Sequence, residues 1–180
     1  MERRASMPLG VVIERRRSKS PWQEWIWRPV SVIPGAPAVG AEGRELIHGE
    51  GWTHYHAATL PLELHRGETE AYLLNLSQRP PRVYVVLRPA SEPCPHPYRP
   101  LLVTASPYEA ESYQESGDEI VEGVVMPELV VSWVQAFVQR HHVDRPFVKR
   151  KRWKLGAPST EHAPSGSERP ASRIGGREDG

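Results

Sequence analysis

Short runs of alternating or β-branched apolar residues recur between residues 9 and 125, and prolines or glycines separate them. In "LGVVIERR", for example, Leu9, Val11 and Ile13 alternate with smaller or polar residues, which is typical of a strand with one buried face. The pattern predicts seven strands, over residues 9–16, 22–33, 52–65, 70–76, 83–88, 100–105 and 119–125.

The segment "WTHYHAATLPLELH" (52–65) has the longest alternation in the chain. If it is one regular strand, every second residue points to the same side of the sheet. Trp52, His54 and His56 then share a face with Leu62 and Leu64. We expect this face to lie at the edge of the core.

Two segments have helical patterns instead. "SPYEAESYQ" starts with Ser106 as a helix cap, Pro107 at the first helical position and Glu109 three residues after the cap, which is a capping box. A longer helix is predicted from Pro127 to about His142. Its apolar stripe consists of Val130, Trp133, Val134, Phe137 and Val138.

The order of these elements predicts an α+β fold that is mainly antiparallel β. About seven strands would form a sheet or small barrel packed against the C-terminal amphipathic helix. Residues 77–82 ("SQRPPR") are expected to form a turn between antiparallel strands. Residues 35–50, which are rich in glycine and alanine, are expected to form a long loop.

The chain length of 180 residues is sufficient for one domain with a substantial core. From residue 156 the composition changes to glycine, proline, alanine and serine, with Ile174 as the only large aliphatic residue. Such a segment buries too little apolar surface to offset its ordering entropy. We therefore predict a single folded domain over residues 8–154 and a disordered tail over 155–180.

Charge is distributed unevenly although the formal net charge is only +1. Between Arg99 and Arg140 the chain has acidic residues and no lysine or arginine, and a basic run follows. The candidate partner-binding residues in this run are Lys149, Arg150, Lys151, Arg152 and Trp153. We expect them to dock an acidic protein partner, with weak nucleic-acid binding as an alternative.

The only cysteine, Cys94, excludes an internal disulfide and any metal site built from several cysteines of one chain. The apolar run "PLGVVI" is too short for a secretion signal, and no segment has the length of a membrane-spanning helix. We therefore expect a cytoplasmic protein that does not interact with membranes.

Four segments in a fixed order resemble a proteobacterial family of unknown function. They are "SPWQEWIWRPVSVIPGAP", "LELHRGETEAYLLNLSQRPPRVYVVLRP", "VTASPYEAESYQESGDEIVEGVVMPE" and "RPFVKRKR". Members of this family are typically encoded beside molybdenum-dependent formate dehydrogenase and redox-enzyme chaperone genes. The resemblance implies a role in the assembly or operation of that enzyme, and it implies no catalytic residue and no cofactor.

A possible metal site is suggested by His54 and His56, because residues two apart on a strand point to one face. A third ligand would come from His48, Glu50 or His65. The alternative is that both histidines are hydrogen-bonded side chains at the edge of the core.

The densest aromatic cluster is "WQEWIWRP". On a strand, Trp25 and Trp27 share one face, while Trp22 and Ile26 share the other. We expect one of these faces to belong to the core and the other to be available to a partner.

Three functions follow, in decreasing order of support. The first is a non-catalytic accessory protein that binds a formate dehydrogenase subunit or a redox-enzyme chaperone. The second is a small metal-dependent enzyme or molybdenum-cofactor transferase. The third is weak nucleic-acid binding through the basic run.

Overall fold

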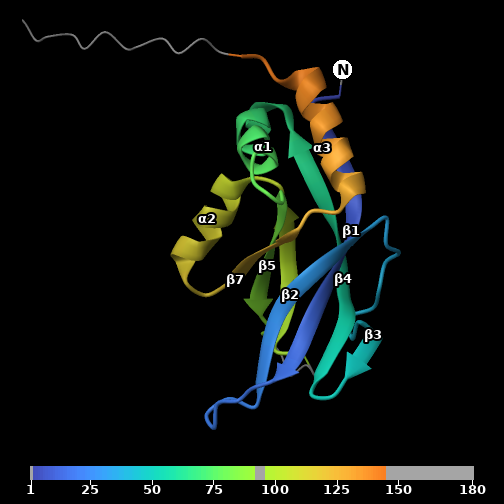
Figure 1. The fold of residues 1–180 in the computed structure, drawn as a ribbon, viewed down its shortest axis with the longest axis vertical. Helices are drawn as coiled ribbons and strands as arrows, with labels where there is room; N and C mark the ends of the chain where they lie inside the picture. Colours follow the sequence, from blue (N-terminus) through green and yellow to red (C-terminus); the bar gives the residue numbers. More distant parts are fainter. Residues whose placement is uncertain (1, 92–95, 145–180) are drawn as a thin grey trace, which may run out of the picture. The chain divides into compact units, whose positions relative to one another are not determined.

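The computed structural model describes residues 2–91 and 96–144, which form two antiparallel sheets and three α-helices (Figure 1). The strands are β1 (Arg4–Arg17), β2 (Trp25–Pro34), β3 (Arg44–Gly49), β4 (Trp52–His65), β5 (Arg82–Pro89), β6 (Tyr98–Thr104) and β7 (Ile120–Val125). The helices are α1 (Thr69–Leu76), α2 (Pro107–Ser116) and α3 (Glu128–His141), with a short 3₁₀ turn at Arg66–Glu68.

The larger sheet has the strand order β2-β1-β4-β3, and the smaller has the order β6-β5-β7. Strand β4 lies against β6, and β2 lies against β7, so the core is enclosed between the two sheets. No ladder joins the two sheets among the described residues, so they do not form a closed barrel. The predicted α+β class is confirmed, as two sheets.

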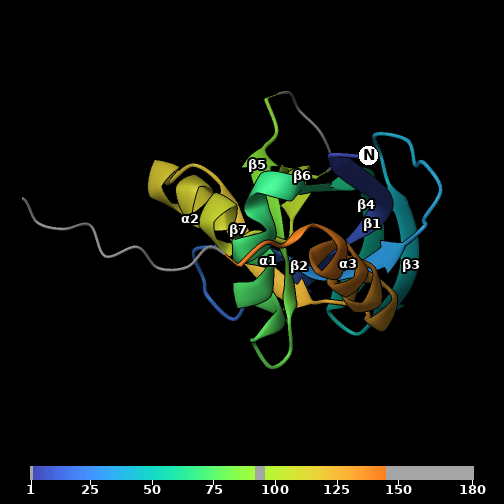
Figure 2. The ribbon, with the colours of Figure 1, turned by 90° about the horizontal axis from the view of Figure 1, so that it is seen from above.

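The helices cover two different parts of this core. Helices α1 and α3 contact each other over one end of the sheets, and α2 lies on the smaller sheet against β5 and β7 (Figure 2). The predicted C-terminal helix is confirmed. Val130, Val134, Phe137 and Val138 are buried, and Trp133 is partly buried against the same core.

The capping box at α2 is confirmed with one modification. The Ser106 hydroxyl accepts a hydrogen bond from the Glu109 backbone N–H at 3.3 Å. The Glu109 carboxylate does not return to the Ser106 backbone. It accepts from the Thr104 hydroxyl at 2.6 Å, and that hydroxyl accepts from the Ser106 backbone N–H at 3.0 Å. The last residue of β6 thus completes the cap.

The prediction that Trp52, His54 and His56 share one face with Leu62 and Leu64 is wrong, although the strand itself has the predicted bounds. Strand β4 carries one extra residue, Ala57, in its pairing with β1. Before this bulge Tyr55 is in the core, and after it Leu62 and Leu64 are. An inserted residue moves all following side chains to the other face, which separates His54 from the leucines.

The predicted strand over residues 70–76 is a helix, α1, so residues 77–82 connect a helix to β5. Its buried face includes Asn75, while Leu73 and Leu74 are exposed. The Asn75 amide donates at 2.7 Å to the carbonyls of Arg82 and Ala105 and accepts from the Arg82 N–H at 2.9 Å. These bonds satisfy backbone groups at the ends of β5 and β6, which favours burial of an asparagine.

The predicted loop over residues 35–50 contains strand β3, so this prediction is wrong for residues 44–49. Strand β3 pairs with β4 through a hairpin at Glu50 and Gly51. Gly51 has a φ of 76°, which favours glycine and allows the tight turn. All six residues of β3 are exposed, because β3 is the outer edge of the larger sheet.

Candidate functional site

The sequence Glu14-Arg15-Arg16-Arg17 ends β1 and places charges alternately on the two faces of the larger sheet. The extra residues at the two β-bulges belong to the neighbouring strands, Val30 to β2 and Ala57 to β4. The alternation of faces along β1 therefore continues without interruption from the core residues Leu9 to Ile13 as far as Arg17. Arg15 and Arg17 extend the core face beyond Ile13. Glu14 and Arg16 lie on the outer face.

On the outer face, Glu14 is the centre of an ion-pair array with Arg16, Arg28 and His54. Its side chain is only 5% exposed. The Arg16 guanidinium donates two hydrogen bonds to the carboxylate, at 2.9 and 3.2 Å. Arg28 Nε lies at 3.4 Å and His54 Nε2 at 2.8 Å, from the strands on either side. Three strands are therefore connected through one carboxylate.

The array keeps Glu14 ionised. The hydrogen bonds from Arg16 have the largest effect on its pKa; burial opposes them, and His54 and Arg28 add to the lowering. Together they lower the pKa of Glu14 to about 2, from an ordinary value of 4.5. An ionised carboxylate only accepts hydrogen bonds, so His54 Nε2 carries the proton in this contact.

His56 occupies a different environment on the same face. It is 5% exposed, and its Nε2 is 2.8 Å from the Thr59 hydroxyl, which donates to the Pro37 carbonyl at 2.6 Å. A Cβ added at Gly10 would lie 2.7 Å from Ala36 Cβ and 2.9 Å from His56 Nε2. His56 is therefore packed under the segment that follows β2, where it supports the fold.

The predicted metal ligands His54 and His56 share one face, but their Nε2 atoms are hydrogen-bonded to different partners. Among the candidate third ligands, His48 lines the pocket on the opposite face, and His65 is at the far end of β4. Residues 2–91 and 96–144 contain no group of three metal-binding side chains that could hold an ion. The metal site stays a prediction without a third ligand in this part of the chain.

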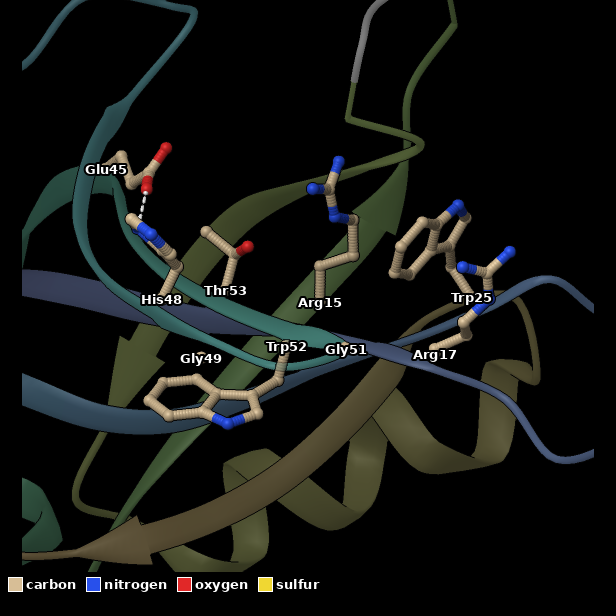
Figure 3. A pocket seen from close by; sticks show the side chains of 9 residues that line it. All are labelled: Arg15, Arg17, Trp25, Glu45, His48, Gly49, Gly51, Trp52 and Thr53. Atoms are coloured by element: carbon tan, nitrogen blue, oxygen red, sulfur yellow. Dashed lines mark hydrogen bonds and ion pairs between the residues drawn. The ribbon is translucent and has the colours of Figure 1, made fainter.

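On the opposite face, Arg15, Arg17 and Trp25 form one wall of a pocket of about 320 Å³, which we call the arginine pocket. Glu45, His48 and Thr53 point to the same side of the sheet (Figure 3). The remaining lining residues are Gly49, Gly51 and Trp52. Its lining residues come from the end of β1, the start of β2 and the hairpin between β3 and β4.

The two arginines stack on one indole. The guanidinium carbon of Arg15 is 4.5 Å from the centroid of the Trp25 ring, and that of Arg17 is 5.5 Å away. In Figure 3 the indole lies between the two guanidinium groups. Stacking on an aromatic face fixes the plane of a guanidinium and leaves the N–H groups at its edge available.

Neither arginine has an ion pair within the part of the chain that the structure describes. Arg15 Nε is also buried, with no hydrogen-bond partner among those residues. The acidic residue of the pocket, Glu45, accepts instead from His48 Nδ1 at 2.7 Å. The described residues therefore provide no carboxylate that pairs with either guanidinium group.

Three aromatic rings contact one another at the edge of the core, which includes Tyr55. Trp27, which pairs with Arg15, contacts Tyr55 edge to face at a centroid distance of 6.0 Å. His96 stacks on Tyr55 at 4.3 Å and contacts Trp27 at 5.7 Å. The predicted shared face of Trp25 and Trp27 therefore divides into a pocket wall and a core boundary. Ile26, on the other face, is 41% exposed, and Trp22 lies in the preceding turn, 94% exposed.

The model of a family described as DUF3305, protein of unknown function, matches residues 8–151. The chain belongs to the DUF3305 family. This match confirms the expected membership in a family of unknown function. Both the ion-pair array and the arginine pocket lie inside the matched region. No curated protein and no solved structure matches this DUF3305 chain. None of its described helices has the length and apolar composition needed to cross a membrane.

The chemistry of the arginine pocket suits an oxyanion, because stacked guanidinium groups present parallel donors to carboxylate or phosphate oxygens. Sequence reasoning identified Trp25 in this DUF3305 chain but not Arg15 and Arg17. The feature of the sequence that could have identified them is the run of charged residues 14–17, which follows the apolar part of the strand and continues its alternation between two faces. The predicted partner-binding residues Lys149 to Trp153, together with Cys94, lie outside the described residues.

Proposed function

We propose that this DUF3305 protein is a non-catalytic accessory protein that binds a partner polypeptide. The observation that carries the proposal is the arginine pocket, where two cations that have no ion pair with a described residue lie over one indole. The partner is a formate dehydrogenase subunit or a redox-enzyme chaperone, and binding serves the assembly, maturation or operation of a molybdenum and iron–sulfur formate dehydrogenase.

The surroundings of the pocket support a protein partner. Arginine and tryptophan are the side chains most enriched where protein interfaces derive their affinity. Trp22, in the turn before β2, is 94% exposed, and Ile47, which pairs with His54 on the outer face of β3, is 57% exposed. The neighbouring strand β3 is exposed along its whole length and offers backbone groups at the edge of a sheet.

The assignment to formate dehydrogenase is supported by the resemblance of four segments, over about residues 8 to 152, to proteins encoded beside that enzyme. The identity of the partner is thus inferred from gene neighbourhood, and the arginine pocket is the proposed site at which the partner binds.

Recovery of the partner from cells tests the proposal. A tagged full-length chain, expressed in cells that make formate dehydrogenase, is expected to retain an enzyme subunit or a redox-enzyme chaperone. A deletion strain is expected to have reduced formate dehydrogenase activity that the wild-type gene restores. Recovery of neither partner, combined with unchanged activity in the deletion strain, would contradict the proposal.

A second candidate, a small metal-dependent enzyme or molybdenum-cofactor transferase, is favoured by the Glu14–His54 contact of 2.8 Å. A carboxylate that holds an imidazole in one tautomer is a common feature of general bases and metal ligands. Elemental analysis of the purified protein and of the variant His54→Ala/His56→Ala tests it. A stoichiometric metal that the variant loses would favour the enzyme. Absence of metal together with wild-type function of the variant would exclude its metal-dependent form.

A further inference from the structure

We propose that the arginine pocket binds the carboxylate of an acidic side chain, presented by an extended segment of the partner. The source of this carboxylate rests on the proposed function. The recognition itself rests on Arg15, Arg17 and Trp25.

The donors are arranged for a planar anion. Both guanidinium carbons lie over the Trp25 ring, and a guanidinium can donate two parallel N–H bonds to the two oxygens of a carboxylate. Arg15 Nε is a buried donor with no acceptor among the described residues, and a buried donor without a partner is costly. A carboxylate in the pocket would satisfy this donor and neutralise one of two adjacent positive charges.

The opposite wall favours a single negative charge. Glu45 lines the pocket and is hydrogen-bonded to His48 at 2.7 Å, so a ligand meets a carboxylate beyond the arginines. Like charges at short distance repel, and this repulsion increases with the charge of the ligand. A carboxylate has one negative charge, whereas a phosphate ester has between one and two at neutral pH.

Size and position favour a side chain over a free small molecule. The volume of about 320 Å³ is at the lower end of the range of small-molecule sites, which is roughly 300 to 1,000 Å³. The pocket is also open and lies beside the exposed strand β3, which provides its Glu45, His48 and Gly49. A polypeptide can insert one acidic side chain while its backbone remains on the surface.

Calorimetric titration of the full-length protein with a blocked hexaglutamate peptide tests this assignment. We expect saturable binding that weakens with added salt. Arg15→Ala/Arg17→Ala should weaken it about tenfold or more, because two charge-assisted contacts are lost. Arg15→Lys/Arg17→Lys should fall between, because it keeps the charge but loses the planar fork.

The matched control is Arg66→Ala/Arg140→Ala, which removes the same charge from exposed positions near α1 and α3. It should bind hexaglutamate within about twofold of wild type. Equal weakening by the two alanine pairs, or no binding by wild type, would overturn the proposal. Binding of a matched phosphoserine peptide about tenfold more tightly than hexaglutamate would also overturn it, in favour of a phosphate site. Circular dichroism establishes that each variant is folded.

Failure of this inference is distinguishable from failure of the proposed function. If Arg15→Ala/Arg17→Ala recovers the cellular partner as well as wild type does, the pocket is not the docking site, and the accessory function stands. If wild type recovers no partner and the deletion strain keeps its formate dehydrogenase activity, but wild type binds hexaglutamate through these arginines, the carboxylate site stands and the accessory function is wrong.

Discussion

The arginines on the two faces of β1, within residues 14–17, differ in whether they have an ion pair. On the outer face, Arg16 is paired with Glu14, which also contacts Arg28 and His54. On the core face, Arg15 and Arg17 stack on Trp25 and have no ion pair with a described residue. The arginines of the outer face are paired within the protein, whereas those of the core face are available to an anionic ligand.

This difference separates a structural role from a binding role. A buried carboxylate with three positive or hydrogen-bonding neighbours joins strands, and its removal leaves those neighbours without an acceptor. Guanidinium groups that have no ion pair with a described residue contribute less to folding, and the buried Arg15 Nε has no acceptor among those residues. Stability measurements and binding measurements should therefore respond to different residues of the same strand.

The largest stability effect is expected for Glu14→Gln. The neutral amide removes the charge that Arg16, Arg28 and His54 share, so we expect a loss of about 2 kcal/mol in the free energy of unfolding near neutral pH. Urea denaturation measures it. Glu45→Gln, at an exposed pair with His48, is the control and should change stability by about 0.5 kcal/mol or less. Similar losses in both variants would contradict the distinction between the two faces.

The contribution of Glu14 should also depend on pH in a defined direction. Its pKa in the folded state, about 2, is below the ordinary value of 4.5, so the folded state favours the ionised form. The stabilisation is complete above pH 4.5 and is lost as the pH falls from 4.5 towards 2. The difference in unfolding free energy between wild type and Glu14→Gln should shrink across this window. A difference that stays constant would show that Glu14 acts by packing alone.

An intermediate effect is expected at the two histidines of β4. His56→Ala should cost about 1 to 2 kcal/mol, because His56 is buried and its loss leaves Thr59 without a donor. His54→Ala should cost about 1 kcal/mol or less, because Glu14 keeps both arginines. Thermal and urea unfolding of both variants give the order. A larger loss for His54 would mean that the ion-pair array depends mainly on the imidazole.

A small stability effect, comparable with that of His54→Ala, is expected for Arg15→Ala/Arg17→Ala. Losing two partly exposed stacking contacts should cost about 1 kcal/mol or less, although the same variant should lose most of its peptide binding. The measurement is the same urea denaturation. A loss as large as that of Glu14→Gln would indicate that the arginine pocket is a structural feature.

Much of the fold was predictable because strand and helix periods are local properties. The bounds of β4 were predicted correctly, as were the buried stripe of α3 and the cap at Ser106. The strand prediction for residues 70–76 failed because Asn75 is buried by hydrogen bonds to β5 and β6, while Leu73 and Leu74 are exposed. Such a reversal depends on tertiary contacts.

The sites were less predictable than the strands. His54 was identified as a candidate ligand, but its partner Glu14 is forty residues away in the sequence, and only the pairing of β1 with β4 brings them together. Predicting the pocket would have required the pairing of β1 with β2, which places Arg17 beside Trp25, and that of β3 with β4, which adds Glu45 and His48. The bulge at Ala57, which changes the face of β4, also depends on pairing.

The most direct test follows the arginine side chains individually. In a titration with blocked hexaglutamate, NMR signals of the Nε–H groups of Arg15 and Arg17 should shift with one binding curve. Those of Arg16 and Arg28, whose Nε atoms already face Glu14, should remain in place. Shifts at Arg16 and Arg28 with none at Arg15 and Arg17 would contradict the assignment of binding to the core-face pocket.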